Sequence, residues 1–119
     1  MKGERILVAD DSSIAREGLQ RIMESWGSDD DHQIIGSASS VEEVRNLLEG
    51  GLRPSVAIID HKMPNVGDGE RAAKIVRKLS PQTTIVSMSS DDGVTWGDYN
   101  LQKQYRAKEI VDFLTGLKH

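Results

Sequence analysis

The sequence predicts an α/β domain built on a parallel sheet, and three observations support this. Short apolar runs alternate with segments whose apolar residues recur at helical spacing. The runs are apolar throughout, which is typical of strands buried on both faces. The length of 119 residues fits one domain covering residues 1–119. Right-handed helical crossovers would then give a doubly wound, five-stranded, three-layer sandwich.

The strands and helices follow from these patterns in order. Ser12 or Ser13 can cap the first helix, Ser40 and Glu43 have capping-box spacing, and Gly50-Gly51 ends the second helix. The expected strands are 6–9, 34–38, 56–59, 83–88 and a short one near Leu101. The apolar helical positions are Ala15, Leu19, Ile22, Met23 and Trp26, then Val44, Leu47 and Leu48, then Ala72, Ala73, Ile75, Val76 and Leu79, and last Ile110, Val111, Leu114 and Leu117.

Composition excludes several classes of protein. The net charge is −4, whereas a nucleic-acid binder usually carries a basic patch. Cysteine is absent, so disulfides, thiolate metal sites and cysteine nucleophiles are impossible. The start is too short and too acidic for a signal peptide, and no apolar run approaches the roughly 18 residues of a membrane span. We therefore expect a cytoplasmic protein that binds neither nucleic acid nor membrane.

Acidic residues follow two of the predicted strands. Asp10 and Asp11 come directly after the first strand, and Asp60 directly after the third. Ligands in doubly wound sheets bind at the carboxyl ends of the strands, where these three carboxylates would converge if the two strands are neighbours. Close anions repel unless a cation lies among them, and an all-oxygen site suits Mg²⁺.

Two further polar residues are expected at the same edge. Ser89 follows the fourth strand and Lys103 the fifth. A hydroxyl and an ammonium beside a metal and a carboxylate that can act as the nucleophile make a site for phosphoryl transfer. Taken singly, each residue has a simpler explanation as a helix cap, a turn residue or a solvated lysine. The joint order of the residues is what indicates a site.

These residues lie in motifs that resemble a known family. The segments ILVADDS (6–12), VAIIDHKMP (56–64) and IVSMSS (85–90), together with Lys103, resemble the receiver domain of two-component response regulators over nearly the whole chain. The resemblance implies a flavodoxin-like (CheY-like) fold. It also implies a phosphoacceptor signalling domain rather than an enzyme. Because nothing follows the last helix, we expect a stand-alone receiver without an output domain.

The resemblance also implies roles for the site residues. Asp60 would be the phosphoacceptor, Ser89 the switch hydroxyl, and Lys103 the partner of the phosphoryl group. The donor would be a phosphohistidine on a sensor histidine kinase or a histidine phosphotransfer protein, and an unknown downstream protein would receive the signal. The Mg²⁺ ligands would be Asp10 (through water), Asp11, Asp60 and the backbone carbonyl of Lys62.

The chain departs from the family between its last two strands. Ser89 and Lys103 are only 14 positions apart, whereas a helical crossover needs on the order of a dozen residues or more between the strands. We therefore predict that the family's fourth helix is missing or reduced to a turn or a loop. Trp96 in this segment is expected to fold back onto the core, with a contact to a partner protein as the rival interpretation.

Several residues near the site are given narrower hypotheses. The family often carries an aromatic switch residue at the position of Asn100; Tyr99, beside it, should face the other side of the strand. Lys62 and Asp91 could form an ion pair that tunes hydrolysis. His61 is interpreted as a turn residue and His32 as a surface residue.

Two other functions compete with a working receiver. The shortened segment and Asn100 would also suit a pseudo-receiver, an interaction module that never takes phosphate. A phosphatase of the haloacid-dehalogenase type would need a second aspartate where Lys62 stands. A flavodoxin-type mononucleotide binder would need a phosphate loop after the first strand, and the chain has none there.

Overall fold

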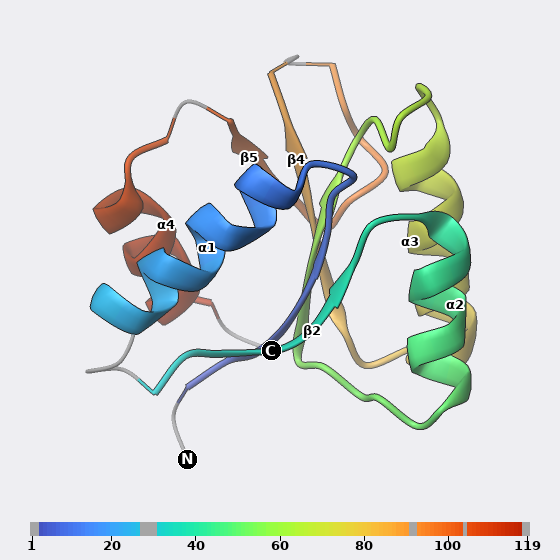
Figure 1. The fold of residues 1–119 in the computed structure, drawn as a ribbon, viewed down its shortest axis with the longest axis horizontal. Coiled ribbons are helices and arrows are strands. Elements are labelled where there is room, and N and C mark those ends of the chain that lie inside the picture. Colours follow the sequence, from blue (N-terminus) through green and yellow to red (C-terminus); the bar gives the residue numbers. More distant parts are fainter. Residues whose placement is uncertain (1–2, 27–30, 91–92, 104, 118–119) are drawn as a thin grey trace.

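A computed structural model shows a five-stranded parallel sheet between two pairs of helices (Figure 1). The structure describes residues 3–26, 31–90, 93–103 and 105–117. The strand order is β2-β1-β3-β4-β5. The elements are β1 (Arg5–Ala9), α1 (Ser13–Ser25), β2 (Gln33–Ala38), α2 (Val41–Glu49), β3 (Val56–Asp60), α3 (Asp68–Leu79), β4 (Thr84–Ser89), β5 (Tyr99–Gln102) and α4 (Ala107–Thr115). The predicted doubly wound α/β class is confirmed.

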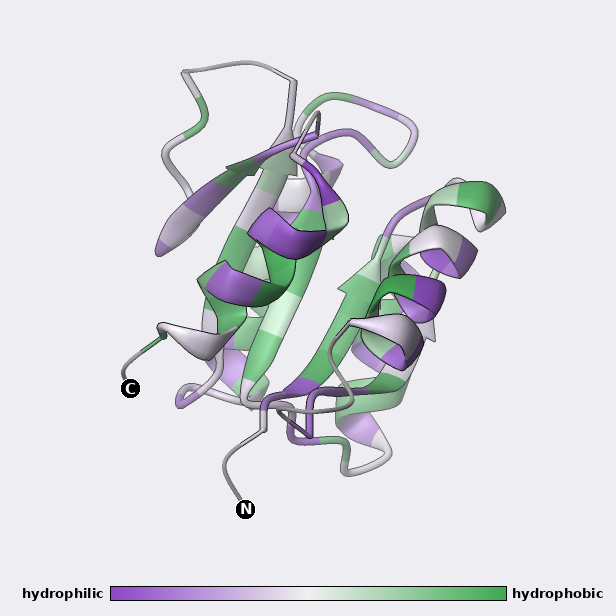
Figure 2. Cartoon of the chain, turned by 90° about the vertical axis from the view of Figure 1, so that its left-hand side faces the viewer, coloured by the Kyte–Doolittle hydropathy of each residue, from purple (hydrophilic) through white to green (hydrophobic). Residues whose placement is uncertain are grey.

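The core lies on both faces of the central strands. Every residue of β3 is buried. Leu7 and Ile59 belong to the cluster beneath α2 and α3, whereas Val8 and Ile58 belong to the cluster beneath α1 and α4. Figure 2 shows the same division, with apolar residues along the strands and polar residues on the outer sides of the helices. Continuous apolar runs are therefore what these central strands require.

The predicted caps of the first two helices are present. The Ser12 hydroxyl accepts a hydrogen bond from the Ala15 amide at 3.2 Å, and the Ser40 hydroxyl accepts one from the Glu43 amide at 3.1 Å. The second bond of the predicted capping box differs from the expected one: the Glu43 carboxylate accepts hydrogen bonds from the amide and hydroxyl of Ser39, at 2.6 and 2.7 Å. These two bonds hold the pKa of Glu43 below its usual value.

The link between β4 and β5 contains no helix among its described residues, as predicted. Nine residues join the end of β4 to the start of β5, and we call residues 93–98 the strap. The Asp98 amide donates to the Ile85 carbonyl at 2.7 Å, and the Asp98 carboxylate accepts from the Ile85 amide at 2.8 Å. A Cβ added to Gly97 would lie 2.8 Å from the Ser87 nitrogen. The strap therefore lies directly against β4.

The expectation for His32 was wrong, because this residue is only 4% exposed. Its Nδ1 accepts a hydrogen bond from the Glu4 amide at 2.9 Å, and its Nε2 lies 3.0 Å from the Thr115 hydroxyl. Both ring nitrogens thus have hydrogen-bond partners inside the protein, so burying the imidazole leaves no polar atom without a partner. The ring joins the start of β2 to the end of α4.

Candidate functional site

Three carboxylates meet where β1 and β3 end. The two strands are adjacent, with Ala9 paired to Ile59, so the residues that follow them reach the same edge of the sheet. One carboxylate oxygen from each of Asp10, Asp11 and Asp60 lies within 4.8 Å of the others. Asp10 and Asp60 are each 4% exposed, whereas Asp11 is exposed. The predicted convergence of these residues is therefore found.

The chain beyond β1 holds Asp10 in place. Its Oδ1 accepts a hydrogen bond from the Ser12 amide at 2.9 Å, and its backbone carbonyl accepts one from the Arg16 guanidinium at 2.7 Å. Burial raises the pKa of Asp10; the Ser12 hydrogen bond opposes this, and the nearby charge of Asp60 adds to it. A cation among the three carboxylates would relieve their mutual repulsion.

The donor chemistry of the cluster fits a hard divalent cation. All three side chains offer carboxylate oxygens, the ligands that Mg²⁺ prefers, and a site with few protein ligands leaves room for the waters that Mg²⁺ retains. Asp10, Asp11 and Asp60 are the residues that could hold the ion. Lys62, whose carbonyl is the expected fourth ligand, stands at the start of the loop that follows β3.

Lys103 places a positive charge beside Asp60. Its Nζ lies 3.0 Å from Asp60 Oδ1. The Lys103 amide donates a hydrogen bond to the Ser89 carbonyl at 3.1 Å, so the end of β4 fixes the backbone position of Lys103. Ser89 is 2% exposed and is the last residue of β4. The acidic cluster, the hydroxyl-bearing strand end and the ammonium are thus parts of one edge of the sheet.

The residues of β5 face opposite sides, as predicted. The Asn100 carbonyl oxygen Oδ1 accepts a hydrogen bond from the Ser87 hydroxyl at 2.8 Å. The Tyr99 ring instead meets the Phe113 ring of α4 edge-on, with centroids 5.5 Å apart. Tyr99 therefore does not occupy the place that the family's aromatic switch would take on the Asn100 side. A switching role for either residue stays a prediction.

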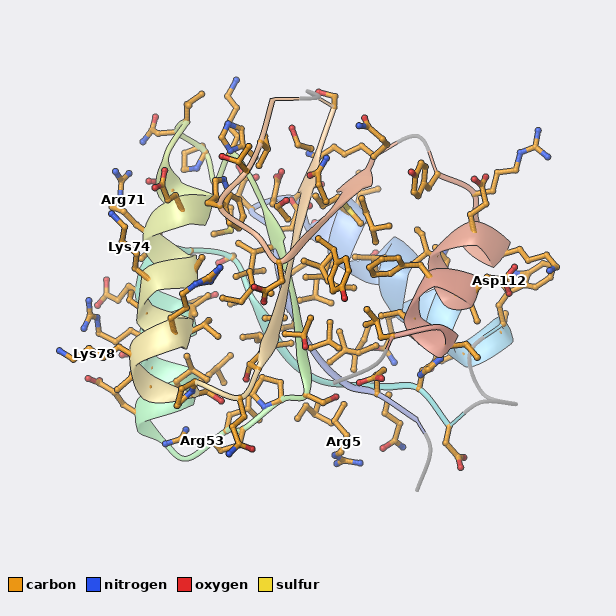
Figure 3. The ribbon with its side chains drawn as sticks, turned by 180° about the vertical axis from the view of Figure 1, so that it is seen from behind. Arg5, Arg53, Arg71, Lys74, Lys78 and Asp112 are labelled. Atoms are coloured by element: carbon orange, nitrogen blue, oxygen red, sulfur yellow. The ribbon has the colours of Figure 1, made fainter. Side chains whose placement is uncertain are left out.

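The residues expected to tune the site have different outcomes. Lys62 is exposed, and its amide lies 3.5 Å from Asp60 Oδ1. Asp91 lies outside the described residues, so the Lys62–Asp91 ion pair stays a prediction. Figure 3 shows Arg71, Lys74 and Lys78 on the outer side of α3.

One contact beside the site was not predicted. Trp96 is half-buried against the core, as expected, but its indole Nε1 also donates a hydrogen bond to His61 Nδ1 at 3.1 Å. His61 immediately follows Asp60. No signal in the sequence links Trp96 to His61, which are 35 positions apart.

The family model of the response regulator receiver domain matches residues 6–115. The chain belongs to this family. The receiver is 31% identical over 117 residues to a protein-glutamate methylesterase/protein-glutamine glutaminase of Geobacter sulfurreducens, covering 96% of the receiver and 28% of that protein. It is 35% identical over 86 residues to the response regulator GacA of Pseudomonas protegens, covering 71% of the receiver and 38% of GacA.

Solved structures agree with this assignment. The signal receiver domain of the response regulator NarL from Mycobacterium tuberculosis superposes with a TM-score of 0.74 at 26% identity, covering 98% of the receiver and 100% of that domain. The receiver thus spans well under half of the curated relatives and the whole of the isolated NarL domain. Within its described residues, the receiver contains no helix long and apolar enough to cross a membrane.

Proposed function

We propose that this receiver accepts a phosphoryl group on Asp60 from the phosphohistidine of a sensor kinase or phosphotransfer protein, in a Mg²⁺-dependent reaction. Family membership supports the general role, phosphoacceptor signalling in a two-component system. The observation that carries the specific proposal is the environment of Asp60. It is a buried carboxylate with an ammonium 3.0 Å away and two further carboxylates within 4.8 Å.

The proposed reaction is a single displacement at phosphorus. A carboxylate oxygen of Asp60 forms the new P–O bond while the P–N bond to the donor imidazole breaks, and that imidazole takes up a proton as it leaves. Lys103 neutralises the negative charge that Asp60 and the phosphoryl oxygens share. Mg²⁺, when bound, would offset the charge of the carboxylates and of the phosphoryl oxygens. Ser89 is assigned as the hydroxyl that binds a phosphoryl oxygen.

The output step and the tuning of lifetime are also part of the proposal. The phosphorylated receiver would pass its state on by a conformational change that a separate downstream protein recognises. The Lys62 ammonium would hinder the hydrolytic water, so Lys62→Ala is expected to shorten the lifetime of the phosphorylated form. Equal hydrolysis rates in the variant and the parent would remove this assignment.

Phosphorylation by acetyl phosphate, with and without Mg²⁺, tests the proposal directly. Intact-protein mass spectrometry should show one phosphoryl adduct that depends on Mg²⁺ and is absent in Asp60→Asn. Asp112→Asn is the matched control, because Asp112 lies on α4 and pairs with Lys108 instead (Figure 3). No adduct in the parent, from acetyl phosphate or from a phosphorylated histidine phosphotransfer protein, would refute the proposal and favour the pseudo-receiver.

A further inference from the structure

The strap brings a tryptophan to the loop of residues 61–67, which follows Asp60 and which we call the acceptor loop. Trp96 packs against the core cluster that α2 and α3 cover. A Cβ added to Gly69, in the first turn of α3, would lie 2.8 Å from Trp96 Cζ2. The indole therefore occupies space that any side chain at position 69 would invade. It lies between the first turn of α3 and the residue that follows Asp60.

The contact between Trp96 and His61 has a defined chemistry. The indole N–H can only donate, so His61 Nδ1 is the acceptor of this hydrogen bond. The two rings are inclined by 21°, with centroids 6.2 Å apart. The hydrogen bond and the ring contact together fix the orientation of the imidazole on the α3 side of the loop.

The backbone of His61 is held on two further sides. Its amide donates to the Met88 carbonyl of β4 at 3.0 Å, and its carbonyl accepts from the Gly69 amide of α3 at 3.3 Å. His61 lies between Asp60, the proposed acceptor, and Lys62, whose carbonyl is the proposed metal ligand. Because the His61 backbone is fixed by these two hydrogen bonds, a displacement of its imidazole is expected to shift the backbone of Asp60 and Lys62.

Trp96 has firm backing on the strap. The Arg77 guanidinium of α3 donates to the Trp96 carbonyl at 2.8 Å. Two residues further on, Asp98 is bound to Ile85 of β4 through both its amide and its carboxylate. The strap is thus hydrogen-bonded to β4 and α3 through Trp96 and Asp98, and the Trp96 side chain is hydrogen-bonded to the acceptor loop.

We propose that Trp96 is a positioning residue of the acceptor site, which holds the Asp60–Lys62 backbone through its hydrogen bond to His61 and links occupancy of the site to the strap. The inference deepens the proposed function and rests on it. Binding of Mg²⁺ and of a phosphoryl group changes the charge beside His61, and the hydrogen bond carries that change to the strap. The strap thereby takes a signalling role in the link between β4 and β5, whose described residues contain no helix.

The two tryptophans of the chain allow this link to be observed. In Trp26→Phe the only tryptophan is Trp96, and in Trp96→Phe it is Trp26, which is 53% exposed at the end of α1. Fluorescence is recorded on addition of Mg²⁺ and then of acetyl phosphate. We expect the emission of Trp96 to change in intensity or wavelength and that of Trp26 to stay constant. Unchanged Trp96 emission, in a sample shown by mass spectrometry to be phosphorylated, would overturn the link and leave the acceptor function intact.

Two variants of His61 separate the hydrogen bond from packing. Asn places an acceptor oxygen, Oδ1, close to the position of the imidazole Nδ1, whereas Leu places a methyl group there. We expect His61→Leu to slow phosphorylation by acetyl phosphate about three- to tenfold, the worth of one hydrogen bond, and His61→Asn to stay within about twofold of the parent. Both changes leave Trp96 itself in place.

The outcomes distinguish the two proposals. Equal slowing in His61→Leu and His61→Asn, or slowing in neither, would overturn the positioning role while the parent still forms the adduct. Absence of the adduct in the parent would overturn the acceptor function and the positioning role together. The predicted order of rates, with Trp96 alone responsive in fluorescence, would establish both.

Discussion

Two glycines that lie in helices are predicted to respond to alanine in opposite directions. Gly18 in α1 has open space where a Cβ would lie. Gly69 in α3 does not, because its Cβ would be 2.3 Å from the Asp60 carbonyl oxygen and 2.9 Å from the His61 Cα. Ordinary van der Waals contact begins at 3.4 Å, so α3 and the acceptor loop would have to separate by about 1 Å.

The magnitudes follow from these distances. Gly18→Ala should raise the free energy of unfolding by about 0.5–1 kcal/mol, because alanine favours the helix and restricts the unfolded chain. Gly69→Ala gains part of the same term but forces backbone against backbone, at a cost of about 1–3 kcal/mol or more. The two variants should therefore differ by about 1–4 kcal/mol, although the chemical change is the same.

Urea unfolding followed by far-UV circular dichroism measures this difference, since the midpoint and slope give the free energy in water. Gly18→Ala serves as the matched control for every effect of alanine that is not steric. A Gly69→Ala protein as stable as the parent would refute the close packing of α3 against the Asp60 carbonyl, and with it the geometry on which the contact of Trp96 depends.

Three further predictions concern the caps and the strap. Ser40→Ala should lower the free energy of unfolding by about 1 kcal/mol, measured by urea unfolding, because the Glu43 amide loses its acceptor. The folded protein lowers the pKa of Glu43, so the ionised carboxylate stabilises the fold fully above the usual glutamate pKa, and this stabilisation is lost as the pH falls through the lower pKa of the folded state. Glu43→Gln should therefore be less stable than the parent at neutral pH. The difference in the free energy of unfolding should shrink in acid. Asp98→Ala should lower the free energy of unfolding by about 1–3 kcal/mol, because the Ile85 amide loses its side-chain acceptor. Asp98→Asn should lower it much less, because the accepting oxygen remains and the exposed ion pair with Arg77 contributes little. Equal losses of stability in the two variants, measured by urea unfolding, would contradict this reasoning.

The fold was predictable because its signals are local. Each strand and helix carries its own periodicity, and the Ser12 and Ser40 caps are short-range patterns that the structure confirms. That the described residues of the β4–β5 link contain no helix was predictable from length alone, since nine residues are fewer than the dozen or so that a helical crossover needs.

The candidate site was predictable only in part. Strand ends gather at a known edge of a doubly wound sheet, so the meeting of Asp10, Asp11 and Asp60 followed from topology. The contact of Trp96 with His61 and the burial of His32 did not follow, because each depends on the position of a partner far along the chain. Hydrogen bonds of this kind leave no periodicity in the sequence.

The short link between β4 and β5 also bears on how the sheet opens. β5 is an edge strand that pairs only with β4, and it has four residues. The strap is bound to the same strand, so β5 and the strap can detach together while the four other strands stay paired. Regions with few buried contacts open at a small fraction of the global unfolding free energy, and amide exchange in β5 should accordingly be faster than in β3. Each such opening would break the hydrogen bond between Trp96 and His61, and each closing would form it again. The contact between the strap and the acceptor loop would therefore break and re-form repeatedly without global unfolding.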